Sequence, residues 1–305
     1  MLDGDIRGFF DQMSHVVTLE LVQRRIADPR VLRLIQKWLK AGVSEDGQWS
    51  ETVVGTPQGA VISPLLANIY LHYVLDEWAH AWRQTAAGEV FAVRYADDAV
   101  FCFQHRADAE RFLKQLQERL AAHGLELHPD KTRLIEFGRF AESERRNRGH
   151  GPPETFDFLG FTHICGRSRE GKFQVKRRTM AKRMRAVLLR IKQELRARMH
   201  EPVVLVGAWM KQVVEGYYRY HCVPGNLPMM AKFRHRVKLL WRRALRNRGG
   251  KRKPSWQKLI PLFERWLPYA RVLHPYPRER FSVKHPRWEP YAGKPQVRIC
   301  PGGVS

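Results

Sequence analysis

The chain has 305 residues, 44% of them hydrophobic, which is enough for roughly two domains with cores of their own and excludes a disordered chain. It carries 54 Lys and Arg against 30 Asp and Glu, which gives a net charge of +24 and a pI near 10.4. For a protein this basic, we expect a polyanionic partner, either nucleic acid or an anionic lipid surface.

The positive charge is concentrated in the second half of the chain. Residues 1–160 contain 19 basic and 23 acidic residues, whereas residues 161–305 contain 35 basic and 7 acidic residues, a net charge of +28. Aromatic residues are interleaved with these basic residues and could stack on bases, although more than half of the rings are expected in the core. No apolar run approaches the roughly 20 residues that span a bilayer, so nucleic acid is favoured and no membrane association is expected.

The four cysteines indicate neither a disulfide framework nor a zinc module, because they lie far apart with no C-x-x-C spacing. The N-terminal residues do not combine a basic region with an apolar stretch, so they do not predict a signal peptide. Both observations favour a reducing, cytoplasmic location.

In chain order, the first half predicts short strands alternating with helices. The elements are a strand over 2–6, a helix over 16–39 interrupted at Pro29, a helix capped by Ser63 with Pro64 in its first turn, strands over 90–95 and 99–103, a helix over 108–123, and strands over 125–127 and 133–137. This order predicts an α+β fold, with an antiparallel sheet backed by helices.

The second half predicts a mainly helical structure. Residues 139–153 are polar and rich in Gly and Arg, which is typical of a loop. Helical periodicity follows over 175–199, 203–221 and 229–247, and a Pro-rich tail begins at residue 251.

Two adjacent carboxylates, Asp97 and Asp98, lie at the junction of the predicted hairpin, where a two-residue turn ordinarily prefers Asn-Gly or Asp-Gly. An isolated Asp-Asp pair is most often a solvated turn. With a third carboxylate from a neighbouring strand, such a pair can bind two divalent cations ~3.5–4 Å apart for phosphoryl transfer. Asp5, at the end of the first predicted strand, is the candidate for that third carboxylate, whereas Asp11 and Asp76 are predicted to be structural or capping.

Five motifs occur in this order: D-I-R-G-F-F-D at residues 5–11, G-T-P-Q-G-A-V-I-S-P-L-L-A-N-I-Y-L at 55–71, Y-A-D-D at 95–98, G-L-E-L-H-P-D-K-T at 124–132 and F-D-F-L-G-F at 156–161. This ordered set resembles the palm of reverse transcriptases. The residues within each motif are similar to those of the bacterial group II intron reverse transcriptase/maturase family. The resemblance implies a reverse-transcriptase palm over residues 1–165. It implies a basic, helical thumb or maturase-specific domain with a Pro-rich tail over residues 166–305.

The resemblance also assigns roles to particular residues. Asp5, Asp97 and Asp98 resemble the catalytic, metal-binding carboxylates for two Mg²⁺ ions, with the backbone carbonyl of Ile6 near the metal. Phe10 matches the position where an aromatic ring would clash with a ribose 2′-hydroxyl. The other implied sites are a nucleotide-binding loop and turn (Gln58, Gly59, Lys131) and a primer grip (Phe158, Leu159, Gly160, Phe161).

Two of these assignments have a simpler alternative. An exposed lysine in a turn is the commoner explanation of Lys131, and a buried strand would resemble the Phe158–Phe161 segment.

The implied function is RNA-directed DNA synthesis, with group II intron RNA, a DNA primer or target and dNTPs as partners, together with a maturase role in intron splicing. The alternative is a catalytically inactive, RNA-binding maturase or a truncated remnant. Family members carry fingers before the first catalytic carboxylate, whereas four residues precede Asp5 here, so fingers are expected to be missing. The Cys and His clusters of the family's endonuclease domain are also not found in the sequence, so no DNA nicking is expected.

Overall fold

The computed structural model describes residues 1–41, 55–56, 61–168, 170–248 and 254–276, together with the backbone of 43–45 and 48–50. The chain divides into two compact units between Glu136 and Phe137. This division is not the predicted boundary between the palm and the thumb domain, at residues 165 and 166, which stays a prediction. Each unit is described by itself below.

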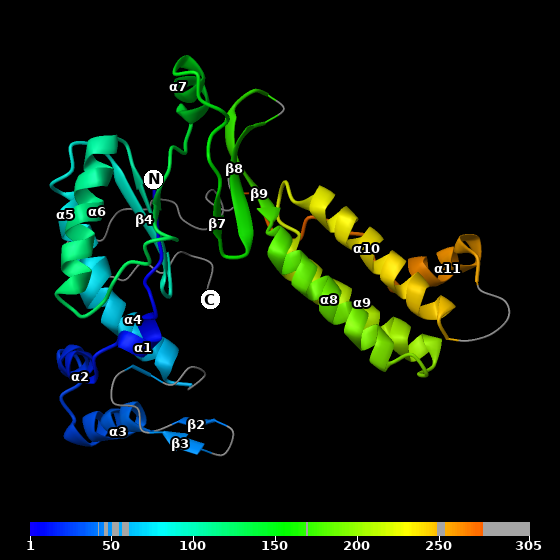
Figure 1. Ribbon diagram of the computed structural model, residues 1–305, viewed down its shortest axis with the longest axis horizontal. Helices are drawn as coiled ribbons and strands as arrows, with labels where there is room; N and C mark the ends of the chain where they lie inside the picture. The colour runs from blue at the N-terminus through cyan, green and yellow to red at the C-terminus, as the bar shows by residue number, and fades with distance from the viewer. Residues whose placement is uncertain are drawn as a thin grey trace. The chain divides into compact units, whose positions relative to one another are not determined.

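The first unit is built on a four-stranded antiparallel sheet with strand order β4-β5-β1-β6 (Figure 1). Its strands are β1 (Leu2–Gly4), β4 (Val90–Tyr95), β5 (Asp98–Phe103) and β6 (Arg133–Leu134), and a separate hairpin pairs β2 (Val43–Glu45) with β3 (Gln48–Ser50).

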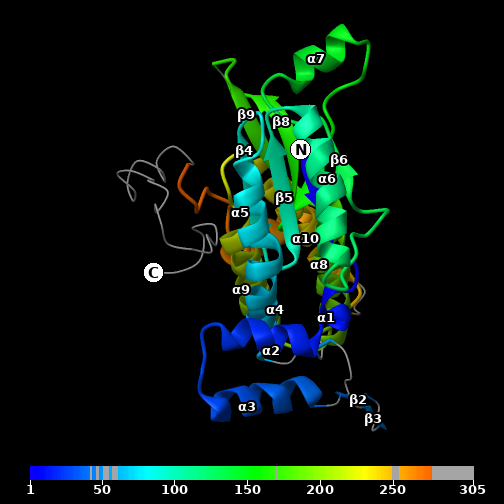
Figure 2. The same ribbon diagram turned by 90° about the vertical axis from the view of Figure 1, so that its left-hand side faces the viewer.

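Helices complete the core of the first unit. They are α1 (Phe9–Gln12), α2 (His15–Gln23), α3 (Pro29–Lys40), α4 (Ser63–Leu71), the π-helical turn η1 (His72–Asp76), α5 (Glu77–Arg83) and α6 (Arg106–Ala121). Figure 2 shows α4, α5 and α6 running along the strands. Phe112 of α6 and Tyr70 of α4 are fully buried, and their rings, together with the alternating apolar residues of the strands, exclude water from this side of the sheet.

The interrupted helix predicted over 16–39 is confirmed as α2 and α3. Asp28 ends the break by capping α3, since its carboxylate accepts a hydrogen bond from the Arg30 backbone N–H at 2.8 Å, and Pro29 occupies the first turn. The expected cap of α4 is wrong in detail. Ser63 lies inside the helix, which begins one residue earlier than predicted and has no side-chain cap.

The second unit combines a three-stranded antiparallel sheet with a helical bundle (Figure 1). Its elements are α7 (Ala141–Asn147), β7 (Phe156–Phe158), β8 (Phe161–Arg167), β9 (Phe173–Thr179), α8 (Ala181–Ala197), α9 (Val203–His221), α10 (Leu227–Arg246) and α11 (Trp256–Trp266). The bundle core is large and aromatic, and it includes the fully buried Phe233, Trp241 and Phe263.

Two predictions in this half are wrong. The helix predicted over 175–199 begins only at Ala181, because residues 173–179 pair with β8 over their whole length as β9. Long-range pairing, which a local pattern does not report, outweighs helix propensity here. The loop predicted over 139–153 contains α7, whose residues favour helix but bury only Ala141, so apolar periodicity could not signal it.

A buried polar cluster links the sheet of the second unit to its helices. Asn226 accepts a hydrogen bond from the Thr179 backbone N–H at 3.0 Å and donates to the Thr179 hydroxyl at 2.7 Å, and that hydroxyl lies 3.3 Å from Nδ1 of His221. Desolvation by burial, helped by the nearby Arg183 charge, lowers the pKa of His221 to about 4. The folded state therefore holds this imidazole neutral.

None of the described helices combines the length and the apolar character that crossing a membrane requires.

The neutral His221 predicts that the second unit is less stable in mild acid. Because the folded pKa lies below the ordinary value of 6.5, the unfolded state binds more protons in this window, so stability falls as the pH falls. Between pH 7 and 5 the expected loss is about 2 kcal/mol. Urea titrations followed by hydrogen exchange of the α9 and α10 amides will measure it.

His221→Gln should remove this part of the pH dependence, whereas the matched replacement of the exposed His235 on α10 should leave it intact. An unchanged pH dependence in His221→Gln would contradict the assignment.

Candidate active site

The register of the first sheet brings the three predicted carboxylates into one neighbourhood. β1 pairs antiparallel with β5, and the last pair of the register is Gly4 with Ala99. One residue further along each strand are Asp5 and Asp98. Residues that are far apart in sequence therefore end adjacent strands at the same edge of the sheet.

The hairpin prediction for the Asp pair is confirmed. Strands β4 and β5 pair through to Tyr95 and Asp98, so Ala96 and Asp97 form the two-residue turn and Asp98 is the first residue of β5. Ala96 adopts a left-handed backbone conformation, with φ of 54°, which is unusual for a residue other than glycine. Asp98 is exposed, and Asp5 and Asp97 are half-buried.

Lys131 contacts the same cluster of carboxylates, which consists of Asp5, Asp97 and Asp98. Its ammonium forms an ion pair with Asp5 at 2.8 Å. The hydrogen bond and charge of Asp5 raise the pKa of Lys131, and Asp98 and Asp97 add to the effect in that order. The turn that carries Lys131 is anchored to the same residue, because the His128 backbone N–H donates to the Asp5 carbonyl at 2.8 Å. The position of a lysine ammonium shows that a cation is accommodated beside these carboxylates.

The donor set suits a hard divalent cation, since three carboxylates supply the oxygen ligands that Mg²⁺ prefers. Across the described ranges, however, no group of three or more His, Cys, Asp or Glu side chains is arranged to hold a metal ion. The chemistry of the cluster therefore fits a divalent cation, and in this structure the Asp5 carboxylate forms its ion pair with Lys131. Ile6 is buried, and its backbone bridges to Leu127.

The loop that precedes α4 is attached to α1, the helix that carries Phe10. The Thr56 N–H donates to the Phe10 carbonyl at 2.7 Å, and the Gly55 N–H donates to the Met13 carbonyl at 3.0 Å. Gly55 has φ of 88°, and a Cβ on it would lie 2.6 Å from the Phe10 carbonyl oxygen, so a side chain is excluded there. Phe10 is half-buried and packs edge-to-face on Phe9. Gln58 and Gly59, on the same loop, lie outside the described residues.

The predicted primer-grip segment forms the tip of the β7–β8 hairpin in the second unit. Leu159 and Gly160 make the turn with positive φ values, and Phe158 pairs with Phe161. The Tyr220 hydroxyl donates to the Leu159 carbonyl at 2.7 Å, and the Tyr220 ring stacks on Phe161. Aromatic packing from α9 therefore holds the hairpin tip.

The strongest buried ion pair near the carboxylates was not singled out by sequence reasoning. Arg94 of β4 binds Asp76 through two hydrogen bonds, at 2.7 and 2.6 Å, and its side chain is 9% exposed. Asp76 is thus structural, as predicted, but it caps no helix. The sequence did contain a signal for this ion pair. Arg94 lies two residues before the turn, and the alternation of side chains along the strand directs it inward, where an arginine needs an acidic partner.

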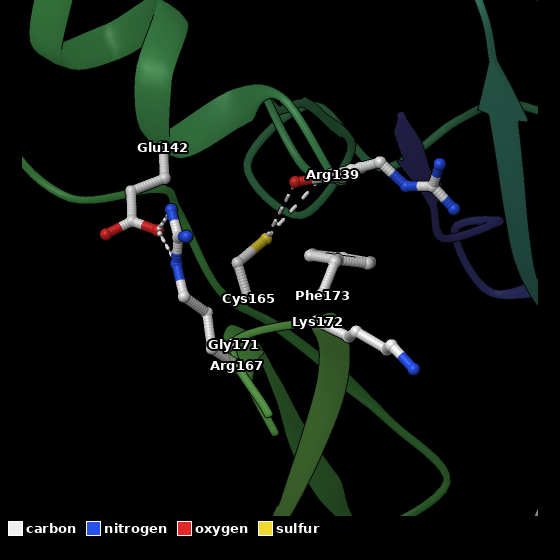
Figure 3. A pocket seen from close by; sticks show the side chains of 9 residues that line it. Arg139, Glu142, Cys165, Arg167, Gly171, Lys172 and Phe173 are labelled. Carbon is white, nitrogen blue, oxygen red and sulfur yellow. Dashed lines mark hydrogen bonds and ion pairs between the residues drawn. The ribbon is translucent and has the colours of Figure 1, made fainter. Parts of the chain in front are cut away.

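A cavity of about 430 Å³ lies in the second unit, between α7 and the β8–β9 hairpin (Figure 3). Arg167 and Glu142 form an ion pair at its edge, and burial raises the pKa of the Cys165 thiol, so that thiol is protonated at neutral pH. None of the sequence-predicted site residues that the structure describes lines this cavity.

Competition between Lys131 and a divalent cation at Asp5 predicts that Lys131→Met tightens Mn²⁺ binding. An exposed ion pair contributes roughly 0.2–1 kcal/mol, so the expected gain is about 1.4- to fivefold. Electron paramagnetic resonance of free Mn²⁺ during titration will measure it. Lys114→Met, an exposed lysine on α6, is the matched control, and unchanged or weaker Mn²⁺ binding in Lys131→Met would refute the competition.

Comparison with known proteins shows the family of the chain. Residues 1–163 match the family model described as Reverse transcriptase (RNA-dependent DNA polymerase). Enzymes that transfer nucleotides in this way generally use divalent metal ions.

Similar curated proteins include the group II intron-encoded protein LtrA of Lactococcus lactis subsp. cremoris, 51% identical over 71 residues, which cover 23% of this chain and 12% of that protein. Protein YkfC of Escherichia coli (strain K12) is 30% identical over 204 residues, covering 57% of this chain and 49% of that protein. The chain therefore spans at most about half the length of these relatives.

Among solved structures, telomerase from Candida albicans in complex with a fragment of telomeric RNA aligns with a TM-score of 0.43 and 10% identity, covering 86% of this chain and 45% of that one. The sequence match extends over more than half of the chain and includes every carboxylate of the cluster, which confirms the resemblance drawn from the motifs. The chain belongs to the reverse transcriptase family.

Proposed function

We propose that the chain is an RNA-directed DNA polymerase of the group II intron type, which extends a DNA primer with dNTPs on an RNA template and assists splicing of its intron RNA. The observation that carries the proposal is the β1–β5 register, by which Asp5 follows the strand end next to Asp97 and Asp98. Three carboxylates at one sheet edge repel one another, and a role in binding cations offsets that cost.

Asp5, Asp97 and Asp98 would hold two Mg²⁺ ions, with the Ile6 carbonyl beside them. When bound, such ions activate a primer 3′-hydroxyl and stabilise the charge of the leaving pyrophosphate. The protein itself contributes position: the sheet holds the carboxylates, and the turn bonded to the Asp5 carbonyl holds Lys131 next to them. Lys131, released from Asp5, would reach the phosphates of the nucleotide.

Phe10 would lie beneath the sugar of the incoming nucleotide. Its helix is bonded to the loop that continues to Gln58 and Gly59, so the ring and this loop are expected to act on the same substrate. The ring leaves no room for a 2′-hydroxyl in this proposal, which selects deoxynucleotides.

The second unit would bind RNA through phosphate contacts. Helices α8 and α10 pack together, and α10 contains no acidic residue. Their exposed basic side chains are Lys182, Arg183, Arg185, Arg190, Lys192, Arg196, Lys232, Arg236, Arg243 and Arg246. Contacts of this kind are blind to base sequence, so recognition of one intron would come from the shape of the RNA and its exposed loops.

The second candidate is an RNA-binding maturase without polymerase activity. The net charge of +28 over residues 161–305 favours it, because contacts to RNA phosphates need basic side chains and not the carboxylate cluster. The cluster of Asp5, Asp97 and Asp98 favours the polymerase, since a protein that only binds RNA gains nothing from carboxylates near a phosphate backbone.

Primer extension separates the two candidates. The purified chain is expected to incorporate dTTP on poly(rA)/oligo(dT) in Mg²⁺. Asp97→Asn/Asp98→Asn should lower the rate at least about 100-fold, because bound metal ions contribute several kcal/mol to the transition state.

RNA binding by the double variant, measured by filter retention across a salt series, is the control and should match that of the parent chain. A folded parent chain that binds RNA without incorporating dTTP would instead establish the maturase that only binds.

Phe10→Ala is expected to increase incorporation of ribonucleotides relative to deoxynucleotides about 10- to 100-fold, because removing the ring relieves a steric clash with the 2′-hydroxyl. The ratio of kcat/KM for UTP and dTTP will measure this selectivity. Phe140→Ala, an exposed phenylalanine in the second unit, serves as the control. If Phe10→Ala discriminates between UTP and dTTP as the parent chain does, Phe10 does not select deoxynucleotides.

A further inference from the structure

Arg94 makes contacts that join three separate elements of the first unit. Its Nε and Nη2 donate to the two oxygens of Asp76, at 2.7 and 2.6 Å. Its Nη1 donates to Oδ1 of Asn68 at 3.0 Å and to the carbonyl of Ala96 at 2.7 Å. A single guanidinium therefore binds α4, the end of η1, and the turn that carries the Asp pair.

The two side chains that receive Arg94 are themselves held in place. Asn68 donates from Nδ2 to the Pro64 carbonyl at 3.0 Å, which orients its oxygen toward Arg94. Asp76 closes η1, a π-helical turn between α4 and α5, and π-helical turns occur frequently at functional sites. The planar guanidinium fits this rigid set of acceptors, which a lysine ammonium cannot match.

The turn requires such support. Ala96 has φ of 54°, a conformation that residues other than glycine and asparagine rarely adopt. The next two residues, Asp97 and Asp98, carry negative charges that repel each other. A hydrogen bond from Arg94 to the Ala96 carbonyl stabilises the turn at the residue where the strain lies.

The burial of Arg94 separates its role from that of Lys131. The Arg94 side chain is 9% exposed, whereas that of Lys131 is 62% exposed. Strand alternation directs Arg94 toward the helices, while Phe91 and Tyr95 of the same strand are exposed on the opposite face. Arg94 is therefore inaccessible to a nucleotide or to a nucleic-acid phosphate.

We infer that Arg94, held by Asp76 and Asn68, is a positioning residue that fixes the Ala96–Asp97 turn and thereby sets where the Asp97 and Asp98 carboxylates meet the metal ions. This inference rests on the proposed polymerase function for its consequence in catalysis, but the fixing of the turn is independent of it. The bond to the Ala96 carbonyl transmits the rigidity of α4 and η1 to the hairpin.

The test uses three variants of the full chain. Arg94→Met removes every bond, Arg94→Lys keeps the charge without the fork of donors, and Asp76→Asn preserves shape while weakening the anchor. Arg119→Met is the matched control, because Arg119 also binds the η1 segment, through the Val74 carbonyl at 3.1 Å, but makes no bond to the hairpin.

Hydrogen exchange of the amides of residues 95–99, followed by mass spectrometry, reports on the turn without requiring activity. Exchange is expected to accelerate at least tenfold in Arg94→Met, less in Arg94→Lys and Asp76→Asn, and not at all in Arg119→Met. Far-ultraviolet circular dichroism establishes that each variant is folded. If Arg94→Met does not fold, the decision rests on Arg94→Lys and Asp76→Asn.

Primer extension then tests the consequence for the carboxylates. The expected result is a fall of kcat of about 10- to 100-fold in Arg94→Met, a rise of several-fold in the half-saturating Mg²⁺ concentration, and an unchanged KM for primer and template. Partial recovery is expected in Arg94→Lys.

The inference would be overturned if the Arg94 and Asp76 variants fold and the amides of residues 95–99 exchange at the same rate as in the parent chain. A parent chain without polymerase activity but with the expected change in exchange would sink the proposed function and leave the turn-fixing role standing.

Discussion

The antiparallel pairing of β1 with β5 is the constraint on which the candidate site depends. It joins residues about 95 positions apart, and its register decides that Asp5, rather than Asp3, follows the last pair beside Asp98. Because side chains alternate across a strand, a shift of one residue would turn Asp3 of β1 to the other face and would move Asp5 away from its place beside Asp98. The buried Leu2 holds the register, since the same shift would expose it.

Two cations near the carboxylates illustrate how burial separates roles. Arg94 is enclosed and bonded bidentately, so it acts as part of the scaffold, whereas Lys131 is exposed and bound through one ion pair that solvent screens. The buried arginine is therefore fixed with its partner, whereas the exposed lysine is held by a weaker contact. In the proposed function, this difference would let Lys131 give way to a metal ion while Arg94 keeps the turn in place.

The second unit follows a different principle. Neutral groups link its sheet to its helices, namely the buried Asn226 cluster and the Tyr220 hydroxyl that donates to the Leu159 carbonyl, while many of its basic side chains are exposed. Neutral groups therefore order the sheet against the helices. Burial lowers the pKa of His221, and the nearby Arg183 charge adds to the effect, so the imidazole in this link stays neutral.

The amino-acid sequence by itself determined the α+β class, the break at Asp28–Pro29, the β4–β5 hairpin and the family, because these depend on local turn chemistry, periodicity and ordered motifs. It could not decide that residues 173–179 are a strand or that α7 is a helix, since pairing with β8 and an exposed helix without an apolar face leave no local pattern. Only the tertiary structure decided that Arg94 reaches Asp76, Asn68 and Ala96, and that Lys131 lies on Asp5. Contacts of this kind join elements distant in sequence, and their geometry is set by packing.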